Sequence, residues 1–173
     1  MLMSSFRSFY RAEAPLLEPH HLLASLNKEV AHEVGTTGMF ITAAAFRISE
    51  DGQSLSYAGA GHNPVYLYRA RGDSIEELES QGPPLGYMSS PTYEVSDVAL
   101  YPGDVLVLYT DGIVEATDRG EEMFGEERFK SCIATKAHSS ADDILEGIFA
   151  ELAEFTGRHS QQDDVSVSVL KIL

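Results

Sequence analysis

The chain has 173 residues, of which 43% are hydrophobic, so it can bury a core and has an ordinary globular composition. Its net charge of −15 opposes attraction to nucleic acid and to anionic membranes, and no apolar stretch approaches the roughly 20 residues that span a bilayer. The N-terminus lacks a signal-peptide pattern, and the single cysteine, Cys132, cannot form an internal disulfide. We therefore expect a cytoplasmic protein that contacts neither nucleic acid nor membrane, whose acidity serves solubility or concentrates carboxylates around divalent cations.

The first elements in chain order are two predicted helices. Apolar residues recur at helical spacing over 1–12, and this segment has no cap residue before it, as though the pattern began upstream. Pro15 ends that helix, and Pro19 stands in the first turn of a second one that ends near the glycines of 35–38.

Strands follow from residue 40 to residue 110. The hydrophobic pattern predicts them over these ranges: 40–48, 54–60, 65–68, 75–79, 93–100 and 105–110. Glu50–Gln53 is a hairpin turn signal, and Tyr101–Asp104 has Pro and Gly at the central positions of a type II turn. Such short connections imply antiparallel pairing.

Two helices and one strand complete the chain. Residues 125–136 and 140–155 read as helices, the second with Ser140 as its N-cap, and alternating valines from Val165 predict a last strand. Helices grouped around a run of strands indicate an α+β fold, and the length suits a single domain over 1–173.

Carboxylates stand at the ends of two predicted strands. The apolar run 105–110 leads directly into Asp111 and Gly112, and a helical turn starting there would place Glu115 on the same face as Asp111. Asp163 and Asp164 directly precede the last strand. If that strand lies beside 105–110, both groups of carboxylates meet at one edge of the sheet.

A charged oxygen at the end of a buried strand is costly unless it is paired or binds a metal. The nearest cation in sequence after Asp111 is Arg119, which favours a hard divalent cation such as Mg²⁺ or Mn²⁺ as the partner. The alternative is structural: Asp111 caps a helix, and Asp163 with Asp164 forms a turn.

Several longer strings add a resemblance. LYPGDVLVLYTDGIVEATDRGEEMFGEERF and QQDDVSVSVL, with AGAGHNPVYLY and GPPLG upstream, resemble the PPM-type metal-dependent serine/threonine phosphatases, in the bacterial branch typified by stage II sporulation protein E. The resemblance implies a four-layer α-β-β-α sandwich of two mostly antiparallel sheets. It also implies two Mn²⁺ or Mg²⁺ ions at one edge, which activate a water for attack on phosphoserine or phosphothreonine. No protein nucleophile is needed, so Cys132 is expected to be a helix residue without a catalytic role.

The resemblance also assigns roles to single residues. Asp111 matches the metal-binding aspartate of the family's Thr-Asp-Gly motif, and Asp163 matches the metal ligand of its terminal acidic pair. Asp164 matches the second member of that pair, which is expected to order the turn. His62 and Glu115 fall where eukaryotic relatives carry aspartates near an additional metal, and for His62 a structural role in a turn is the stronger interpretation.

The sequence departs from the family at its start. Family members carry a Gly-Gly-Asp motif and an Asp-x-Ser-Gly-His-Gly motif on their first two strands, and this chain has neither. We therefore expect the C-terminal portion of a phosphatase domain, with open sheet edges that favour pairing with a second copy. The expected substrate is a phosphorylated regulatory protein, by resemblance an anti-anti-sigma factor. An inactive pseudophosphatase that binds a partner, or another acidic binding protein, are the alternatives. The 82–86 loop, Gly-Pro-Pro-Leu-Gly, is interpreted as structural, with contact to the substrate as the alternative.

Overall fold

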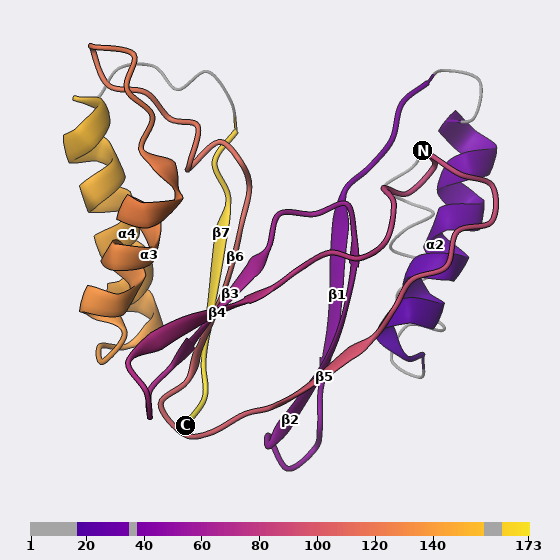
Figure 1. Ribbon diagram of the computed structural model, residues 1–173, viewed down its shortest axis with the longest axis horizontal. Helices are drawn as coiled ribbons and strands as arrows, with labels where there is room; N and C mark the ends of the chain where they lie inside the picture. The colour runs from indigo at the N-terminus through magenta and orange to yellow at the C-terminus, as the bar shows by residue number, and fades with distance from the viewer. Residues whose placement is uncertain (1–16, 35–37, 158–163) are drawn as a thin grey trace. The chain divides into compact units, whose positions relative to one another are not determined.

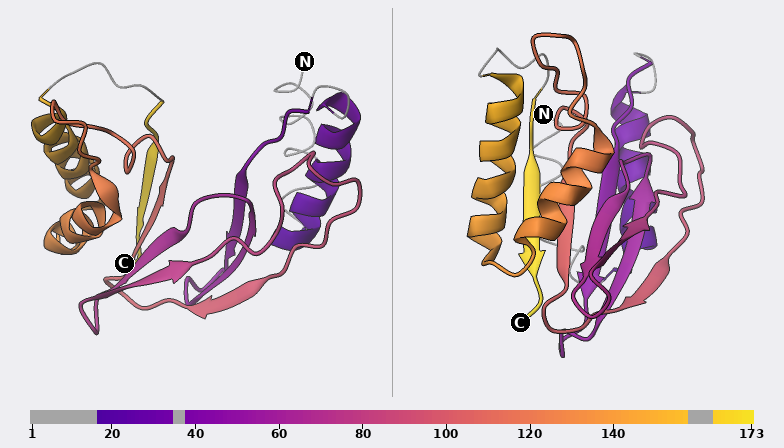
Figure 2. Two further views of the ribbon diagram at one scale, coloured as in Figure 1. Left: turned by 45° about the horizontal axis from the view of Figure 1, so that its top comes forward. Right: turned by 60° about the vertical axis from the view of Figure 1, so that its left-hand side comes forward.

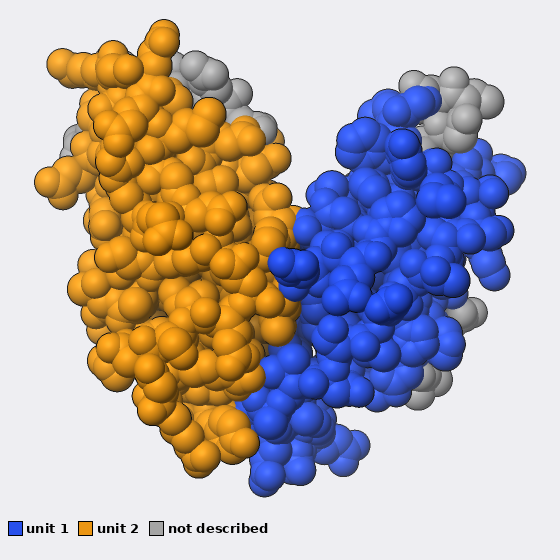
Figure 3. All heavy atoms as spheres, in the orientation of Figure 1, with its two compact units in different colours: residues 1–62, 79–100 blue, residues 63–78, 101–173 orange. Residues whose placement is uncertain are grey.

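The computed structural model describes residues 17–34, 38–157 and 164–173 (Figure 1). The chain forms two compact units, coloured separately in Figure 3. Met1–His62 and Glu79–Leu100 make up the first, and Asn63–Leu78 and Tyr101–Leu173 make up the second. The predicted helix over 1–12 lies outside the described residues. Within the described part of the chain, no helix is both long and apolar enough to cross a membrane.

The first unit is one helix on a small antiparallel sheet. Its elements are α2 (Pro19–Val34), β1 (Ala43–Ile48), β2 (Ser54–Ala60) and β5 (Ser96–Ala99), with strand order β1-β2-β5. Helix α2 packs on β1 and β2 because Leu23, Leu26 and Val30 recur on one face and are buried there. The predicted hairpin turn joins β1 to β2.

The second unit is a four-stranded antiparallel sheet with two helices on one face (Figures 1 and 2). Its elements are β3 (Val65–Arg69), β4 (Ser74–Leu78), β6 (Val105–Tyr109), α3 (Gly125–Lys136), α4 (Ala141–Thr156) and β7 (Val167–Lys171). The strand order is β4-β3-β6-β7, so β6 is an inner strand paired on both sides. Four of its five side chains are buried, and three of these, Val105, Val107 and Tyr109, lie in one core with residues of α3 and α4.

Aromatic side chains fill the core between this sheet and α3. The rings of Tyr66, Tyr109 and Phe129 lie within 4.8–5.8 Å of one another, centroid to centroid. The Tyr109 hydroxyl donates to the Tyr66 hydroxyl at 3.0 Å, which satisfies a polar group in an otherwise apolar core. Burial raises the pKa of Tyr66 to about 12, so both phenols stay neutral at physiological pH.

The α+β prediction with two antiparallel sheets is confirmed, and so are helices α2, α3 and α4. The type II turn is also observed, because Gly103 has φ 94° and the amide of Asp104 donates to the carbonyl of Tyr101. Three strands start later than predicted, among them β5, which begins at Ser96 instead of residue 93. Ile41 pairs with Leu85 only as an isolated bridge before β1, and β7 begins at Val167 instead of residue 165.

Helix α4 offers a test of local stability at its N-terminus. Ser140 is the N-cap, as predicted, and its Oγ accepts a hydrogen bond from the Asp143 amide at 3.1 Å. We expect Ser140→Ala to lower the free energy of unfolding by about 1 kcal/mol, because that amide loses its acceptor. The midpoint of urea unfolding measures the change. Ser139→Ala, at the neighbouring exposed serine, is the control, and equal losses in both variants would contradict the capping argument.

Candidate metal centre

Strand β6 delivers Asp111 to the edge of the second unit's sheet. Tyr109 is the last residue of the strand and pairs with Val167 of β7, so the two strands are neighbours, which is the condition under which the two groups of carboxylates meet. Thr110 follows and is half-buried, and Asp111 is the first exposed residue after the strand. The buried strand β6 is thus followed, two residues after its end, by a solvent-exposed carboxylate.

A single helical turn holds Asp111 and Glu115. The Glu115 amide donates to the Asp111 carbonyl at 2.9 Å, which is the i to i+4 bond of an α-helical turn. The Gly112 amide donates to Asp111 Oδ1 at 3.1 Å. Ile113 is fully buried and anchors the turn in the core, while Glu115 is exposed. The backbone therefore places Asp111 and Glu115 on one face, as the sequence predicts.

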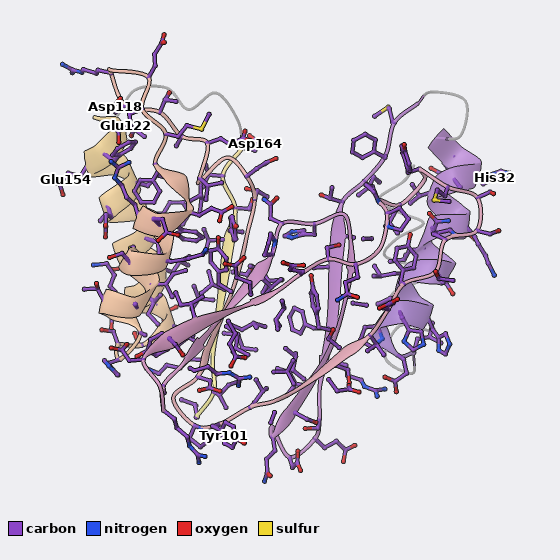
Figure 4. The ribbon with its side chains drawn as sticks, viewed as in Figure 1. His32, Tyr101, Asp118, Glu122, Glu154 and Asp164 are labelled. Atoms are coloured by element: carbon purple, nitrogen blue, oxygen red, sulfur yellow. The ribbon has the colours of Figure 1, made fainter. Side chains whose placement is uncertain are left out.

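The chain leading into β7, on which Figure 4 labels Asp164, lies directly against this turn. A Cβ built on Gly112 would stand 2.7 Å from the Asp164 carbonyl oxygen, a separation that real Cβ atoms do not show. Asp164 is exposed. Asp163, the predicted metal ligand, lies outside the described residues. The structure thus places Asp164 beside the turn that carries Asp111.

His62 belongs to the first unit, whereas Asp111 belongs to the second. His62 is half-buried and follows Gly61, whose amide donates to the Gly82 carbonyl at 2.8 Å. The Gly82 amide in turn donates to the carbonyl of Gly59, and a Cβ at Gly82 would collide with the Tyr93 ring. These contacts give the 82–86 loop a structural role within the first unit, in agreement with its interpretation from the sequence.

The donor chemistry at the end of β6 suits a hard cation, but the described donors are few. Asp111 and Glu115 offer exposed carboxylate oxygens, which Mg²⁺ and Mn²⁺ prefer. Among residues 17–34, 38–157 and 164–173, no three His, Cys, Asp or Glu side chains come together in a way that could hold a metal ion. The described residues therefore fit one part of a metal site.

Cys132 is unsuited to nucleophilic chemistry. Its side chain is buried in α3, and its Sγ faces the Gly147 carbonyl at 4.0 Å. Burial raises the pKa of its thiol to about 12, so the reactive thiolate is scarce at neutral pH.

Sequence reasoning did not single out Thr110, although its side chain joins the two strands of the site. Its hydroxyl donates to the Asp164 carbonyl and accepts from the Ser166 amide. The only sequence signal is a hydroxyl residue directly before the aspartate at a strand end, and that signal does not specify its cross-strand partner.

Comparison with known protein sequences gives consistent similarities. The family described as stage II sporulation protein E matches residues 1–173. Protein IcfG of Synechocystis sp. is 33% identical over 141 residues, which cover 82% of this chain and 22% of that protein. Phosphoserine phosphatase RsbU of Bacillus subtilis is 30% identical over 156 residues, which cover 90% of this chain and 45% of RsbU. The chain thus spans less than half the length of these relatives.

Solved structures share the fold. The SiaA-PP2C domain of Pseudomonas aeruginosa has a TM-score of 0.84 and 22% identity over 98% of this chain and 67% of that one. The phosphatase domain of SpoIIE from Bacillus subtilis, presoaked with Mn, has a TM-score of 0.61 and 16% identity over 99% of this chain and 73% of that one. At these identities the likeness establishes the fold alone.

Proposed function

The chain belongs to the stage II sporulation protein E family, and on that premise we propose that it forms part of a metal-dependent phosphatase that hydrolyses phosphoserine or phosphothreonine in a regulatory protein. The observation that carries the proposal is the exposed Asp111 at the end of an inner strand, with the segment leading into β7 packed against its turn. The proposed compartment is the cytoplasm.

The residues of this chain would act as ligands and not as nucleophiles. Asp111 would bind a cation through its carboxylate, whose Oδ1 is oriented by the Gly112 amide. Asp163 would supply a second carboxylate, and Glu115 stands one helical turn away as an accessory oxygen donor. Two divalent cations bound here would lower the pKa of the attacking water and neutralise charge on the phosphoryl oxygens.

The chain by itself supplies too few ligands for two cations, because each takes about six oxygens. Asp111 and Asp163 need further carboxylates, and the family carries these in the Gly-Gly-Asp and Asp-x-Ser-Gly-His-Gly motifs. Neither motif occurs in the 173 residues. The second candidate function is an inactive pseudophosphatase that binds a phosphoprotein partner, and the observation that favours it is that no three His, Cys, Asp or Glu side chains of the described residues come together as a metal site.

The proposed substrate class is a phosphorylated anti-anti-sigma protein. Its support is the motif resemblance and the similarity to RsbU, which is named a phosphoserine phosphatase. A strongly acidic surface, with net charge −15, also disfavours polyanionic substrates such as nucleic acid.

Metal removal tests the proposed function. The whole gene product that contains this chain is assayed for phosphate release from a phosphoserine protein, with a phosphotyrosine peptide as the control substrate. We expect turnover of the phosphoserine protein with Mn²⁺ or Mg²⁺, its loss in EDTA, and its return when Mn²⁺ is added in excess. Turnover that survives EDTA would contradict the metal mechanism, and no turnover under any condition would favour the pseudophosphatase.

A further inference from the structure

Four large apolar side chains lie together on the surface of the first unit. Met39 is 65% exposed, Phe40 55%, Tyr87 69% and Met88 50%. The rings of Phe40 and Tyr87 meet edge to face with their centroids 6.4 Å apart, so the two pairs of sequence neighbours form one apolar patch. Soluble proteins rarely leave large apolar side chains together in water, and patches of this kind mark interaction sites.

Hydrogen bonds within the same unit hold the apolar patch in place. Ile41 and Leu85 exchange two backbone hydrogen bonds, at 3.0 and 2.8 Å. Asn27 on α2, whose side chain is fully buried, donates from Nδ2 to the Met88 carbonyl at 3.0 Å and accepts at Oδ1 from the Gly86 amide at 2.9 Å. The two segments of the patch are thus joined to each other and to the helix. A surface that is ordered before binding loses little conformational entropy when a partner docks.

The segments that carry the apolar patch are uncharged. Neither 34–46 nor 80–93 contains Asp, Glu, Lys or Arg, although 23% of the whole chain is charged and its net charge is −15. A phosphoprotein adds about −1.5 to −2 for each phosphate, so this acidic chain repels it at long range. An uncharged surface can bind such a partner without local repulsion, and Tyr, Phe and Met are enriched at the centres of protein interfaces.

The area of the apolar patch suits a transient partner. A large apolar side chain has roughly 200 Å² of surface, so four that are half to two-thirds exposed offer about 500 Å². A stable interface buries about 800 Å² on each partner, and transient complexes bury less. A substrate must leave after each turnover, whereas a permanent second copy needs the larger area.

We propose that the apolar patch of Met39, Phe40, Tyr87 and Met88 is a docking surface for the phosphoprotein substrate, which binds it through apolar side chains of its own. This inference rests on the proposed function, because it takes the partner to be the phosphorylated regulatory protein. The surface belongs to the first unit, whereas Asp111 belongs to the second. It therefore selects a protein substrate over a small phosphate ester, which is too small to cover it.

The experiment compares Tyr87→Ala and Phe40→Ala with Tyr87→Phe, which keeps the ring. Phe149→Ala is the matched control, because Phe149 is also exposed, at 39%, but lies on α4 in the second unit. Each variant of the whole gene product is assayed with Mn²⁺ on a serine-phosphorylated anti-anti-sigma protein from the same organism and on p-nitrophenyl phosphate. Calorimetry in EDTA measures binding of the same phosphoprotein, sedimentation gives the oligomeric state, and the thermal midpoint reports folding.

We expect Tyr87→Ala and Phe40→Ala to raise KM for the phosphoprotein and to weaken its binding, each by at least about tenfold. Hydrolysis of p-nitrophenyl phosphate and the thermal midpoints should not change, and Tyr87→Phe and Phe149→Ala should behave like the wild type. Equal KM and affinity in all variants overturn the inference and leave the proposed function intact. Equal losses on both substrates also overturn it, and so does a wild-type dimer that Tyr87→Ala and Phe40→Ala convert to monomers, because the patch then binds a second copy.

Failure of the proposed function is recognised separately. If the wild type hydrolyses neither substrate, the phosphatase proposal fails, and the binding measurement alone decides on the docking surface. Phosphoprotein binding that is present in the wild type and lost in Tyr87→Ala supports the surface. A wild type that does not bind the phosphoprotein overturns it.

Discussion

Asp111→Asn is expected to lower the phosphatase turnover of the whole gene product by at least about 100-fold. Removing a group that only orients a metal ligand costs about 10–100-fold, so removing the charge of a proposed ligand costs no less than the upper end of that range. The fold should persist, because the Asp111 oxygen that accepts from the Gly112 amide has an equivalent in the asparagine amide. The measurement is phosphate release from a phosphoserine protein at saturating Mn²⁺, with circular dichroism to confirm folding.

Asp142→Asn is the matched control for this substitution. Asp142 is an exposed aspartate in the first turn of α4, in the same unit as Asp111, and its charge change costs at most about 1 kcal/mol of helix stability. Its turnover should equal that of the wild type. If Asp111→Asn retains wild-type turnover, the carboxylate at the end of β6 does not bind the catalytic metal.

The predictable part of this structure is the part that local chemistry determines. The apolar run of β6 requires burial on both faces, and the alternating valines of β7 require a sheet, so both strands follow from the hydrophobic pattern, whereas their pairing is known only from the structure. Helix α4 was predictable for the same reason, since Ser140 satisfies an amide that any helix start leaves open.

The passage between the two sheets was not predictable in this way. The chain leaves β2 in the first unit and enters β3 in the second after only four residues, 61–64, although the pattern reads as a continuous run of strands. The reason for the break is tertiary. The Gly61 amide donates a hydrogen bond to the Gly82 carbonyl. Gly82 is 21 positions further along the chain, so the residues next to Gly61 do not reveal this pairing.

The candidate site likewise combines a local feature that the sequence predicts with a long-range contact that it does not predict. The i to i+4 relation of Asp111 and Glu115 is local and was predicted, whereas the bridging role of Thr110 depends on Asp164 and Ser166, more than 50 residues away in sequence. A hydroxyl residue before a strand-end aspartate has many structural uses, and only the neighbouring strand selects this one. The metal roles of Asp111, Asp163, His62 and Glu115 remain predictions, and so does the role of Asp164 in ordering the turn.

The second large effect concerns stability and arises at a buried ion pair that sequence reasoning did not identify. Asp104 is 1% exposed, and its Oδ2 lies 3.0 Å from Nη1 of Arg69, itself 16% exposed. The same carboxylate accepts hydrogen bonds from the backbone amides of Ala70 and Tyr101. It therefore joins the turn after β3 to the turn before β6 at the base of the second unit's sheet.

Asp104→Ala is expected to lower the free energy of unfolding by about 3 kcal/mol, because it leaves a largely buried guanidinium and two backbone amides without this acceptor. The estimate takes the lower end of the usual 3–5 kcal/mol range, since Arg69 keeps an ion pair with Glu76 at 2.7 Å. A domain is stable by only about 5–15 kcal/mol, so the midpoint of urea unfolding should shift clearly. Glu76→Ala removes the other carboxylate from the same arginine, but Glu76 is 52% exposed, so its loss should cost about 1 kcal/mol or less. Equal losses from the two substitutions would mean that burial adds nothing to the Asp104 pair, and the link between the two turns would then contribute no more than a surface contact.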